Sequence, residues 1–267
     1  MSSSDKLSNL WGPRPRAPLI MGILNVTPDS FSDGGRWNTV DAALSHAFDM
    51  VDQGADIIDV GAESTRPGHS PVSGDEELAR LEPVLRELIP SVDVPVSVDT
   101  MKAAVAERCL SLGADMVNDV NGLRDPGMLD VCASSGTYVT IMHMPGDQGT
   151  VHSSDMGEGF AQEILGFLRE RTAAALESGI RDDRIILDPG IGFGKTVEQN
   201  SWILDHSGYF SDGHPVLSGS SRKRFVRATY EGWDIDRASA DAARRAVASG
   251  ASIVRVHDVA ETARALR

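Results

Sequence analysis

The sequence of 267 residues contains few cysteines, few aromatic residues and fewer basic than acidic residues. Its two cysteines, Cys109 and Cys132, are too few for a disulfide framework or a cysteine-rich zinc cluster, and both lie in helical patterns that predict core positions. Lys and Arg number 25 against 39 Asp and Glu, which gives a net charge of −14. This balance argues against nucleic acid as a partner, because such proteins need a basic face to neutralise phosphates. We therefore expect any anionic ligand to be held by a few placed cations.

Long hydrophobic runs are also missing from the chain. No apolar stretch reaches the roughly 20 residues that a membrane-spanning helix needs. Residues 1–17 lack the continuous apolar segment of a signal peptide and form a polar N-terminal arm. These absences predict a cytoplasmic protein without a membrane partner.

Short β-branched runs recur along the rest of the chain, each followed by a turn and a helical pattern. Eight such runs cover residues 19–26, 56–61, 95–100, 116–120, 137–143, 184–189, 215–219 and 253–258. Most are short and uniformly apolar, which is typical of parallel strands buried on both faces. Eight strand and helix pairs without a composition break predict an α/β fold, a single-domain (β/α)8 TIM barrel over residues 18–267. A doubly wound open sheet is the alternative.

A Gly-Ala pair recurs where a helix is expected to end and a strand to begin. The three glycines of these pairs are Gly54, Gly113 and Gly250. Glycine is the preferred residue for a left-handed cap at the C-terminus of a helix. The repeat therefore supports the alternation of helices and strands.

The ends of the predicted strands are unusually polar. Along the chain, these residues are Asn25, Asp59, Asp99, Asn118, Asp188, Lys223, Arg255 and His257. Any one of them could be a structural cap or a satisfied core polar group, but each unpaired buried carboxylate or amide costs about 1–3 kcal/mol. In a (β/α)8 barrel the carboxyl ends of the strands surround the active site. We therefore expect a polar ligand in the middle of this ring.

The ring has an uneven distribution of charge. Strands two to six supply acceptors, whereas the last two strands supply cations, with Arg66 on the second loop. Arg255 and His257, two residues apart on a strand, should point to the same side and suit an anion such as phosphate. Ser221 is predicted to cap the helix that begins there, a second place for an anion. The pattern describes a ligand with a donor-rich ring on the acidic side and a phosphorylated arm on the cationic side.

Two loops, 27–38 and 63–74, are rich in Pro, Gly, Asp and Ser. Loops of this length in a compact barrel are typical of lids or binding loops, and solvated turns are the simpler alternative. The segment 188–196 lacks the GxxxxGK[ST] spacing of a nucleotide-binding P-loop.

Taken together, the motifs resemble those of dihydropteroate synthases over residues 19–267, which is nearly the whole chain. In order, they are LNVTPDSFSDGG, IIDVGAESTRPG, SVDT, NDVNG, MHM, DPGIGFGKT, SRK and RVHDV. The resemblance implies that 6-hydroxymethyl-7,8-dihydropterin diphosphate and 4-aminobenzoate are joined to give 7,8-dihydropteroate and diphosphate, a step of folate biosynthesis.

The same resemblance assigns residues to each part of the substrates. The pterin would contact Asp99, Asn118, Met142, Asp188, Phe193, Gly219, Lys223 and Arg255. The aminobenzoate would contact Phe31, Thr65, Arg66, Pro67 and Ser221. The diphosphate would contact Asn25, Arg66, Arg255 and His257, with Asn25 acting through Mg²⁺ as a metal ligand.

The implied mechanism is a dissociative displacement, in which diphosphate leaves before the amine attacks. Its catalytic residues would be Asp59, Asp99, Lys223, Arg255 and His257. Sulfonamides, which mimic 4-aminobenzoate, should compete with it. No covalent enzyme intermediate is needed.

The resemblance also implies a homodimer. The helix near residues 236–250 commonly contributes to the dimer in this family, but here it carries Asp241, Arg244 and Arg245, which leaves its geometry open. Two other functions remain as alternatives. One is a pterin-binding methyltransferase that uses methyltetrahydrofolate, and the other is a non-catalytic pterin-binding paralogue.

Overall fold

The structure is a computed structural model that describes residues 6–7, 18–27, 36–63, 72–146 and 155–267, with the backbone alone for 36–39. Its eight strands are β1 (Leu19–Asn25), β2 (Ile57–Gly61), β3 (Val96–Asp99), β4 (Met116–Asp119), β5 (Tyr138–Met142), β6 (Ile185–Asp188), β7 (Leu217–Ser218) and β8 (Ile253–Val256). Each lies inside one of the eight predicted runs and differs from it by at most two residues at either end. The predicted runs therefore located every strand.

The strands form one parallel sheet in the order β6-β5-β4-β3-β2-β1-β8-β7. A parallel bridge between Leu187 and Val216 joins the two ends of this order. The backbone N–H of Leu187 also donates to the carbonyl of Pro215 at 2.9 Å. The sheet thus closes into a (β/α)8 TIM barrel, and the open-sheet alternative is wrong.

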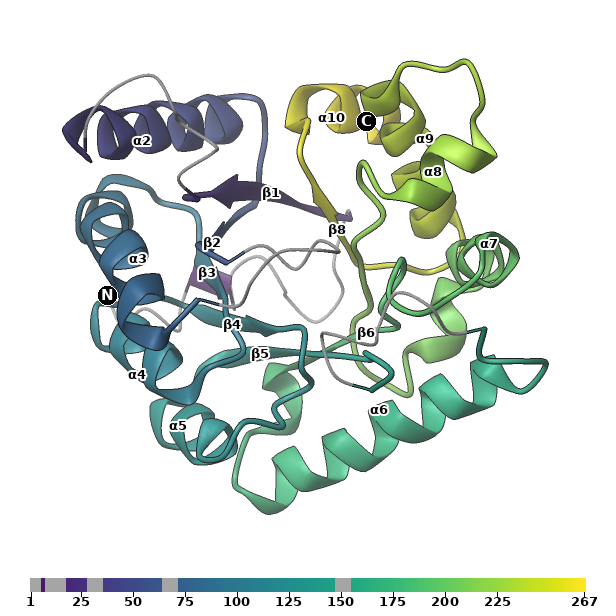
Figure 1. The fold of residues 1–267 in the computed structure, drawn as a ribbon, viewed down its shortest axis with the longest axis horizontal. Coiled ribbons are helices and arrows are strands. Elements are labelled where there is room, and N and C mark those ends of the chain that lie inside the picture. Colours follow the sequence, from purple (N-terminus) through teal and green to yellow (C-terminus); the bar gives the residue numbers. More distant parts are fainter. Residues whose placement is uncertain (1–5, 8–17, 28–35, 64–71, 147–154) are drawn as a thin grey trace.

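Helices surround the barrel on the outside (Figure 1). They are α2 (Arg36–Asp52), α3 (Gly74–Leu88), α4 (Ala103–Ser111), α5 (Met128–Ser135), α6 (Phe160–Glu177), α7 (Val197–Asp205), α8 (Arg224–Thr229), α9 (Ile235–Ala248) and α10 (Val259–Leu266), with short 3-10 turns η2 (Ile89–Ser91), η3 (Asp182–Arg184) and η4 (Ser207–Phe210). None of the described helices is long and apolar enough to cross a membrane. The apolar faces of the helices pack on the sheet in two large clusters, one of which contains Cys109 and the other Cys132. Both thiols are free and fully buried, as predicted.

The Gly-Ala repeats fix the start of the strands that follow them. Gly54, Gly113 and Gly250 have φ values of 102°, 105° and 111°, the left-handed region in which glycine is favoured. After two of these pairs stands an aspartate, whose carboxylate reaches back to the preceding strand. Asp56 accepts from the N–H of Ile20 at 2.8 Å, and Asp115 accepts from the N–H of Val96 at 2.9 Å. The aspartates therefore link the start of β2 to β1 and the start of β4 to β3.

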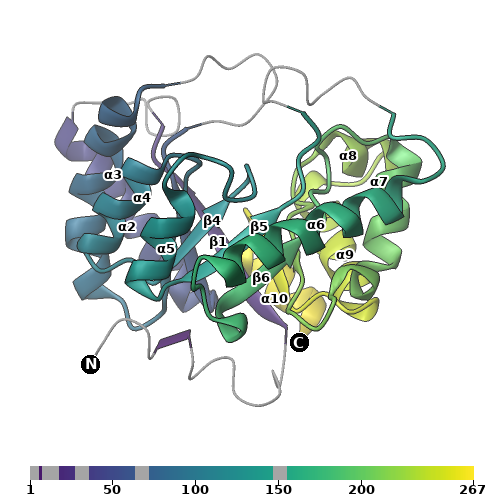
Figure 2. The ribbon, with the colours of Figure 1, turned by 90° about the horizontal axis from the view of Figure 1, so that it is seen from below.

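The amino-terminal end of the barrel is filled by apolar side chains. This inner layer consists of Leu19, Met21, Ile57, Met116, Tyr138, Ile186, Leu217 and Ile253, and Leu7 packs into it. Leu7 is completely buried, and Lys6 beside it donates to the carbonyl of Val92 at 2.8 Å. The short segment Lys6–Leu7 lies below the barrel in Figure 2, on the side of the C-terminus. Leu7 is thus part of the barrel core, which the polar composition of residues 1–17 did not predict.

Candidate active site

At the opposite end of the barrel, side chains from three strands and Arg255 form one hydrogen-bonded cluster. The guanidinium of Arg255 in β8 donates to Asp59 Oδ2 in β2 and to Asp99 Oδ2 in β3, each at 2.6 Å. Asn118 in β4 donates to the same Asp59 oxygen at 3.1 Å. Because β2 and β4 are not neighbours in the sheet, and Arg255 comes from β8, these side chains can meet only in the barrel interior. The expected convergence of these four polar residues is confirmed.

This arrangement corrects the predicted division into an acidic and a cationic side. Arg255 lies between two carboxylates and pairs with both, so it does not form a cationic edge apart from Asp59 and Asp99. Burial raises the pKa of Asp99 to about 7, although Arg255 opposes the rise, and the nearby Asp59 adds to it. The predicted division fails because the arginine side chain on β8 is long enough to cross the barrel interior to β2 and β3.

The end of β6 carries Asp188 together with a tight turn. Asp188 is 5% exposed, and one of its oxygens accepts from the N–H of Gly190 at 2.7 Å. Burial raises the pKa of Asp188, and the ammonium of Lys223 opposes that rise. A side chain on Gly219 would come within ordinary contact distance of Asp188, so this glycine leaves space beside the carboxylate. Asp188 therefore lies beside a residue without a side chain and near the cation of Lys223.

Lys223 lies against an aromatic side chain in the same region. The Lys223 ammonium lies 4.4 Å from the centre of the Phe193 ring, a cation–π contact, and also donates to the carbonyl of Ile191. Burial lowers the pKa of Lys223 to about 8, and Asp188 opposes this shift. Phe193 packs with Met142 and two further buried residues, Val120 and Met144. Predicted wall residues and predicted polar residues thus lie together here.

Ser221 and His257 form a separate contact at the ends of β7 and β8. The Oγ of Ser221 accepts from the backbone N–H of His257 at 3.2 Å and lies 3.0 Å from its Nδ1. The predicted capping role of Ser221 is wrong, because α8 begins at Arg224 and its N-cap position is Lys223, without a side-chain bond. The hydroxyl is engaged by the end of β8 instead.

Several buried oxygens inside the barrel have no hydrogen-bond partner among the described residues. They include Asp59 Oδ1, Ser97 Oγ and Thr140 Oγ1. Ser97 stands beside Asp59 in the β2–β3 register, and Thr140 stands beside Asn118 in the β4–β5 register. Buried polar atoms are nearly always paired in folded proteins. This level of the barrel is therefore suited to a polar ligand or bound water.

The remaining predicted residues have different outcomes. Asn25 is the last residue of β1, with a partly exposed side chain. Phe31, Thr65, Arg66 and Pro67 lie outside the described residues, as do most of loops 27–38 and 63–74. Within the described residues, no group of three or more His, Cys, Asp or Glu side chains could hold a metal ion. A metal at Asn25 would need most of its ligands from the substrate or water.

Two groups of charged residues at this end were missed by the sequence analysis. Lys195, in the motif after β6, lies beside His143 at the end of β5, with Nζ and Nδ1 3.2 Å apart. Lys102, just before α4, pairs with Glu63 and with the fully buried Glu77. A lysine after the glycines of GFGKT is the signal that could have pointed to Lys195. The Lys102 group has no local signal, because its members come from three separate segments.

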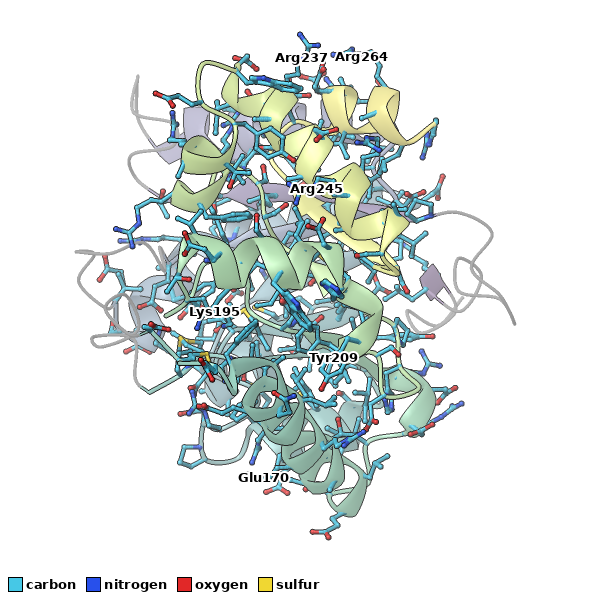
Figure 3. The ribbon with its side chains drawn as sticks, turned by 90° about the vertical axis from the view of Figure 1, so that its right-hand side faces the viewer. Glu170, Lys195, Tyr209, Arg237, Arg245 and Arg264 are labelled. Atoms are coloured by element: carbon cyan, nitrogen blue, oxygen red, sulfur yellow. The ribbon has the colours of Figure 1, made fainter. Side chains whose placement is uncertain are left out.

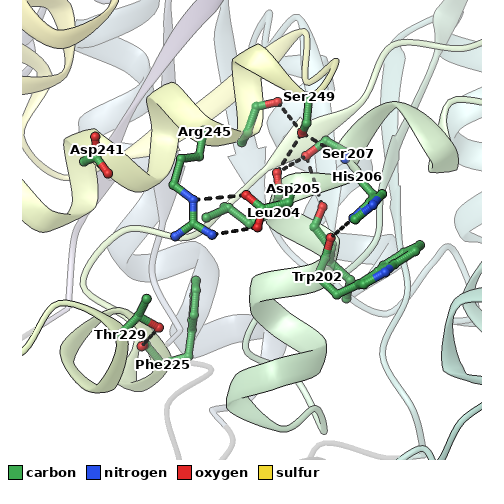
Figure 4. A network of polar contacts seen from close by, with 12 residues as sticks. Trp202, Leu204, Asp205, His206, Ser207, Phe225, Thr229, Asp241, Arg245 and Ser249 are labelled. Carbon is green, nitrogen blue, oxygen red and sulfur yellow. Dashed lines mark hydrogen bonds and ion pairs between the residues drawn. The ribbon is translucent and has the colours of Figure 1, made fainter.

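The charged helix α9 ties neighbouring helices together. Arg245 forms a two-point ion pair with Asp205 at the end of α7, at 3.0 and 2.8 Å (Figure 4). It also donates to the hydroxyl of Tyr230, which donates in turn to Asp241. Figure 3 shows Arg245 on the side of the molecule formed by α7, α8 and α9. At least one of the charges in the 236–250 region is therefore a structural contact within the chain.

Comparisons with known proteins agree with this geometry. Residues 21–257 match the family described as pterin binding enzyme. The dihydropteroate synthase of Bacillus subtilis is 43% identical over 250 residues, which cover 92% of this chain and 85% of that protein. The structure of the Xanthomonas albilineans dihydropteroate synthase with 4-aminobenzoic acid has a TM-score of 0.88 and 43% identity, and covers 94% and 91% of the two chains. The Yersinia pestis dihydropteroate synthase, solved with a sulfonamide drug complex, has a TM-score of 0.87 and 41% identity, with 94% and 92% covered.

Proposed function

The chain belongs to the family of pterin-binding enzymes, and we propose how its residues divide the work of a dihydropteroate synthase. That activity joins 6-hydroxymethyl-7,8-dihydropterin diphosphate to 4-aminobenzoate and releases diphosphate. The observation that carries the assignment of residues is the convergence of Asp59, Asp99, Asn118 and Arg255 inside one end of the barrel. Around them lie the buried carboxylate of Asp188 and unpartnered buried oxygens.

The pterin ring binds with its donor-rich edge on Asp188. A carboxylate that accepts two parallel N–H bonds is the suitable partner for a guanidine-like edge. Asn118 and Asp99 bind other ring nitrogens, and Lys223 binds the carbonyl side. Phe193, Met142 and Gly219 border the slot. This placement is supported by the fact that Phe193 and Met142 belong to the same buried apolar cluster.

The diphosphate binds near Arg255, His257, Arg66 and Asn25. The amide oxygen of Asn25 is a suitable ligand for Mg²⁺, which takes oxygen donors and is usually held by one or two protein groups plus substrate phosphates and water. When bound there, the ion would stabilise negative charge on the departing diphosphate. Arg255 holds Asp59 and Asp99 through Nε and one terminal nitrogen, so its contribution to the diphosphate site would come from its other N–H groups.

In the reaction, the bond between the pterin methylene and the diphosphate oxygen breaks and its electron pair leaves with the diphosphate. The methylene and the conjugated ring then carry positive charge, which the carboxylates of Asp59 and Asp99 stabilise from the barrel interior. The amine of 4-aminobenzoate attacks the methylene with its lone pair to form the new C–N bond, and its proton passes to water. Lys223 stays at the pterin carbonyl and Arg255 keeps both carboxylates in place.

The 4-aminobenzoate binds beside the pterin, with Phe31, Thr65, Arg66, Pro67 and Ser221 as its contacts. We propose that sulfonamides occupy the same place, supported by the Yersinia pestis enzyme solved with a sulfonamide complex. We also propose that the protein works in the cytoplasm as a homodimer. These two assignments are supported by its likeness to the dihydropteroate synthases.

A product assay tests the function directly. Purified protein, the pterin diphosphate, 4-aminobenzoate and Mg²⁺ should yield dihydropteroate and diphosphate in equal amounts. A sulfonamide in the same assay should raise the apparent KM for 4-aminobenzoate and leave kcat unchanged. Removal of Mg²⁺ by a chelator should slow the release of diphosphate.

The contrary results separate the alternatives. If the protein binds the pterin but releases no diphosphate, it is a non-catalytic pterin-binding protein. If the protein transfers a methyl group from methyltetrahydrofolate and does not use the pterin diphosphate, it is a methyltransferase. If a saturating sulfonamide does not compete, the assignment of the aminobenzoate contacts fails.

A further inference from the structure

Lys195 has an unusual environment for a lysine. Its ammonium is buried in the turn between β6 and α7 and donates to the carbonyls of Gly190 and Phe193, both at 2.9 Å. Its third neighbour is the Nδ1 of His143, at 3.2 Å. An ammonium has three donors and no acceptor. All three therefore have partners, which are two carbonyl oxygens and one ring nitrogen. The residue can be located in Figure 3.

The two carbonyls that Lys195 holds belong to the residues that shape the predicted pterin slot. Gly190 donates its N–H to the carboxylate of Asp188 at 2.7 Å, so the position of Gly190 sets the orientation of that carboxylate. Phe193 is the aromatic wall on which Lys223 lies. A substituent on Gly190 would come within 1.9 Å of the carbonyl oxygen of His143, so the turn is pressed against the end of β5. Lys195 thus links the anchor of the pterin edge to the wall of the slot.

His143 supplies a neutral partner on β5. Burial and the charges of Lys195 and Arg124 together lower its pKa to about 3, so the ring is neutral near neutral pH. Its edge packs against Phe167, with ring centres 5.1 Å apart, and its backbone N–H donates to the carbonyl of Asp188 at 2.9 Å. With a charged Lys195, Nδ1 must be the acceptor and Nε2 must carry the proton. The tautomer of His143 therefore reports the contact with Lys195.

The contacts of Lys195 with the two carbonyls do not depend on whether its amine is charged. Burial lowers the pKa of Lys195 to about 7, whereas Asp188 opposes the shift, Lys223 adds to it and Glu163 on α6 opposes it. A neutral amine would still donate to both carbonyls, and its lone pair could accept from a protonated Nδ1 of His143. The two carbonyl contacts are therefore kept in either state of the amine.

We propose that Lys195 is a positioning residue for the pterin, because it holds Gly190 and Phe193 against His143 so that the Asp188 carboxylate and the Phe193 ring face one slot. The inference rests on the proposed function, since it assumes that this slot binds the pterin. It assigns Lys195 no contact with the substrate and no part in bond breaking. Its effect should therefore fall on pterin binding and not on 4-aminobenzoate.

The test compares Lys195→Met with wild-type protein. Methionine keeps most of the volume but removes all three donors. We expect the Kd for 6-hydroxymethyl-7,8-dihydropterin, measured by calorimetry, to rise at least about tenfold, because two hydrogen bonds to the turn are lost. At saturating pterin diphosphate, the KM for 4-aminobenzoate should stay within about twofold. Because substrate KM values are compared separately, a general loss of folding is distinguished from misplacement of the slot.

Lys102→Met is the matched control, since it removes another partly buried lysine at the same end of the barrel, one that contacts Glu63 and Glu77 and not the turn. It should lower the melting temperature and leave the pterin Kd within about twofold. If Lys195→Met does not fold, His143→Phe removes one partner and keeps the ring, and should raise the pterin Kd about threefold or more. In the wild-type protein, a ¹⁵N NMR spectrum should show an unprotonated Nδ1 for His143 when Lys195 is charged.

Each outcome is decisive for one claim. If wild-type protein does not bind the pterin, the proposed function fails before the inference is tested. If wild-type protein binds it and folded Lys195→Met or His143→Phe binds it equally well, Lys195 does not position the slot. If Lys102→Met weakens pterin binding as much as Lys195→Met does, the effect is a general loss of stability, and the inference is overturned. A protonated Nδ1 at a pH where Lys195 is charged would also contradict it.

Discussion

The two ends of the barrel are built from the same strands but differ in chemistry. At the amino-terminal end, alternate residues such as Ile57 and Met116 form an apolar layer, which Leu7 completes. Two positions further along the same strands stand Asp59 and Asn118, which bond to each other in the interior. One end therefore buries apolar side chains, and the other buries polar and charged side chains.

This difference separates stability from function along one axis. Apolar burial stabilises a fold by about 25 cal/mol per Å² removed from water, whereas a buried charge costs free energy unless it is paired. The cost is visible in the pKa of Asp99, which burial raises to about 7, and in the pKa of Lys223, which burial lowers to about 8. Such perturbed groups are typical of functional sites. The polar end is thus arranged for a ligand at the expense of the stability of the free protein.

The largest expected effect is the loss of pterin binding in Asp188→Ala. The carboxylate would otherwise accept two N–H bonds from the pterin edge, and hydrogen bonds to a charged group contribute about 1.5–3 kcal/mol each. We therefore expect a loss of about 3–6 kcal/mol in binding free energy, measured by calorimetry. Unfolding in urea should show no loss of stability of comparable size. Pterin affinity at the wild-type level would mean that the ring is oriented differently.

A smaller effect of the opposite kind is expected for Leu7→Ala. Leu7 is completely buried at the apolar end, and truncation of a buried leucine typically costs about 2–5 kcal/mol. The midpoint of urea unfolding should fall accordingly, and pterin affinity measured well below the melting temperature should be unchanged. Leu176→Ala, the same truncation at an exposed leucine, is the control and should change neither quantity appreciably. An unchanged midpoint in Leu7→Ala would show that Leu7 contributes nothing to the core.

The smallest expected effect is a changed pH dependence of stability in Asp99→Asn. The folded-state pKa of Asp99 is about 7 against an ordinary value of 3.8, so between these values the folded protein binds more protons than the unfolded chain. Its contribution to stability is thus fully present below about pH 4 and is lost as the pH rises toward about 7. Asn does not titrate, so the unfolding free energy of the variant minus that of wild type should rise as the pH increases across this window, and the variant should lose activity. If the difference in unfolding free energy does not grow with pH across the window, Asp99 is ionised without penalty in the fold.

Much of the fold could be predicted from the sequence, because its signals are local. Uniformly apolar runs located all eight strands, and a glycine such as Gly54 marked where a helix ends. The motifs also placed Asp59, Asp99 and Asn118 at one end of the barrel, since the carboxyl ends of parallel strands share an edge.

The rest depends on contacts between distant segments, which local patterns do not contain. Arg255 reaches across the interior to β2 and β3, so a division of charge read from strand order was wrong. Ser221 has the residue type of a helix cap but bonds to His257. Leu7 lies in a polar arm, and its burial depends on the open end of a barrel that forms only after folding.

The most direct test of this account measures two quantities for Leu7→Ala and Asp188→Ala under the same conditions, the free energy of unfolding and the Kd for 6-hydroxymethyl-7,8-dihydropterin. We expect Leu7→Ala to lose stability with the wild-type Kd, and Asp188→Ala to lose affinity with a much smaller change in stability. If both variants lose stability and affinity in the same proportion, the two ends of the barrel do not divide these tasks.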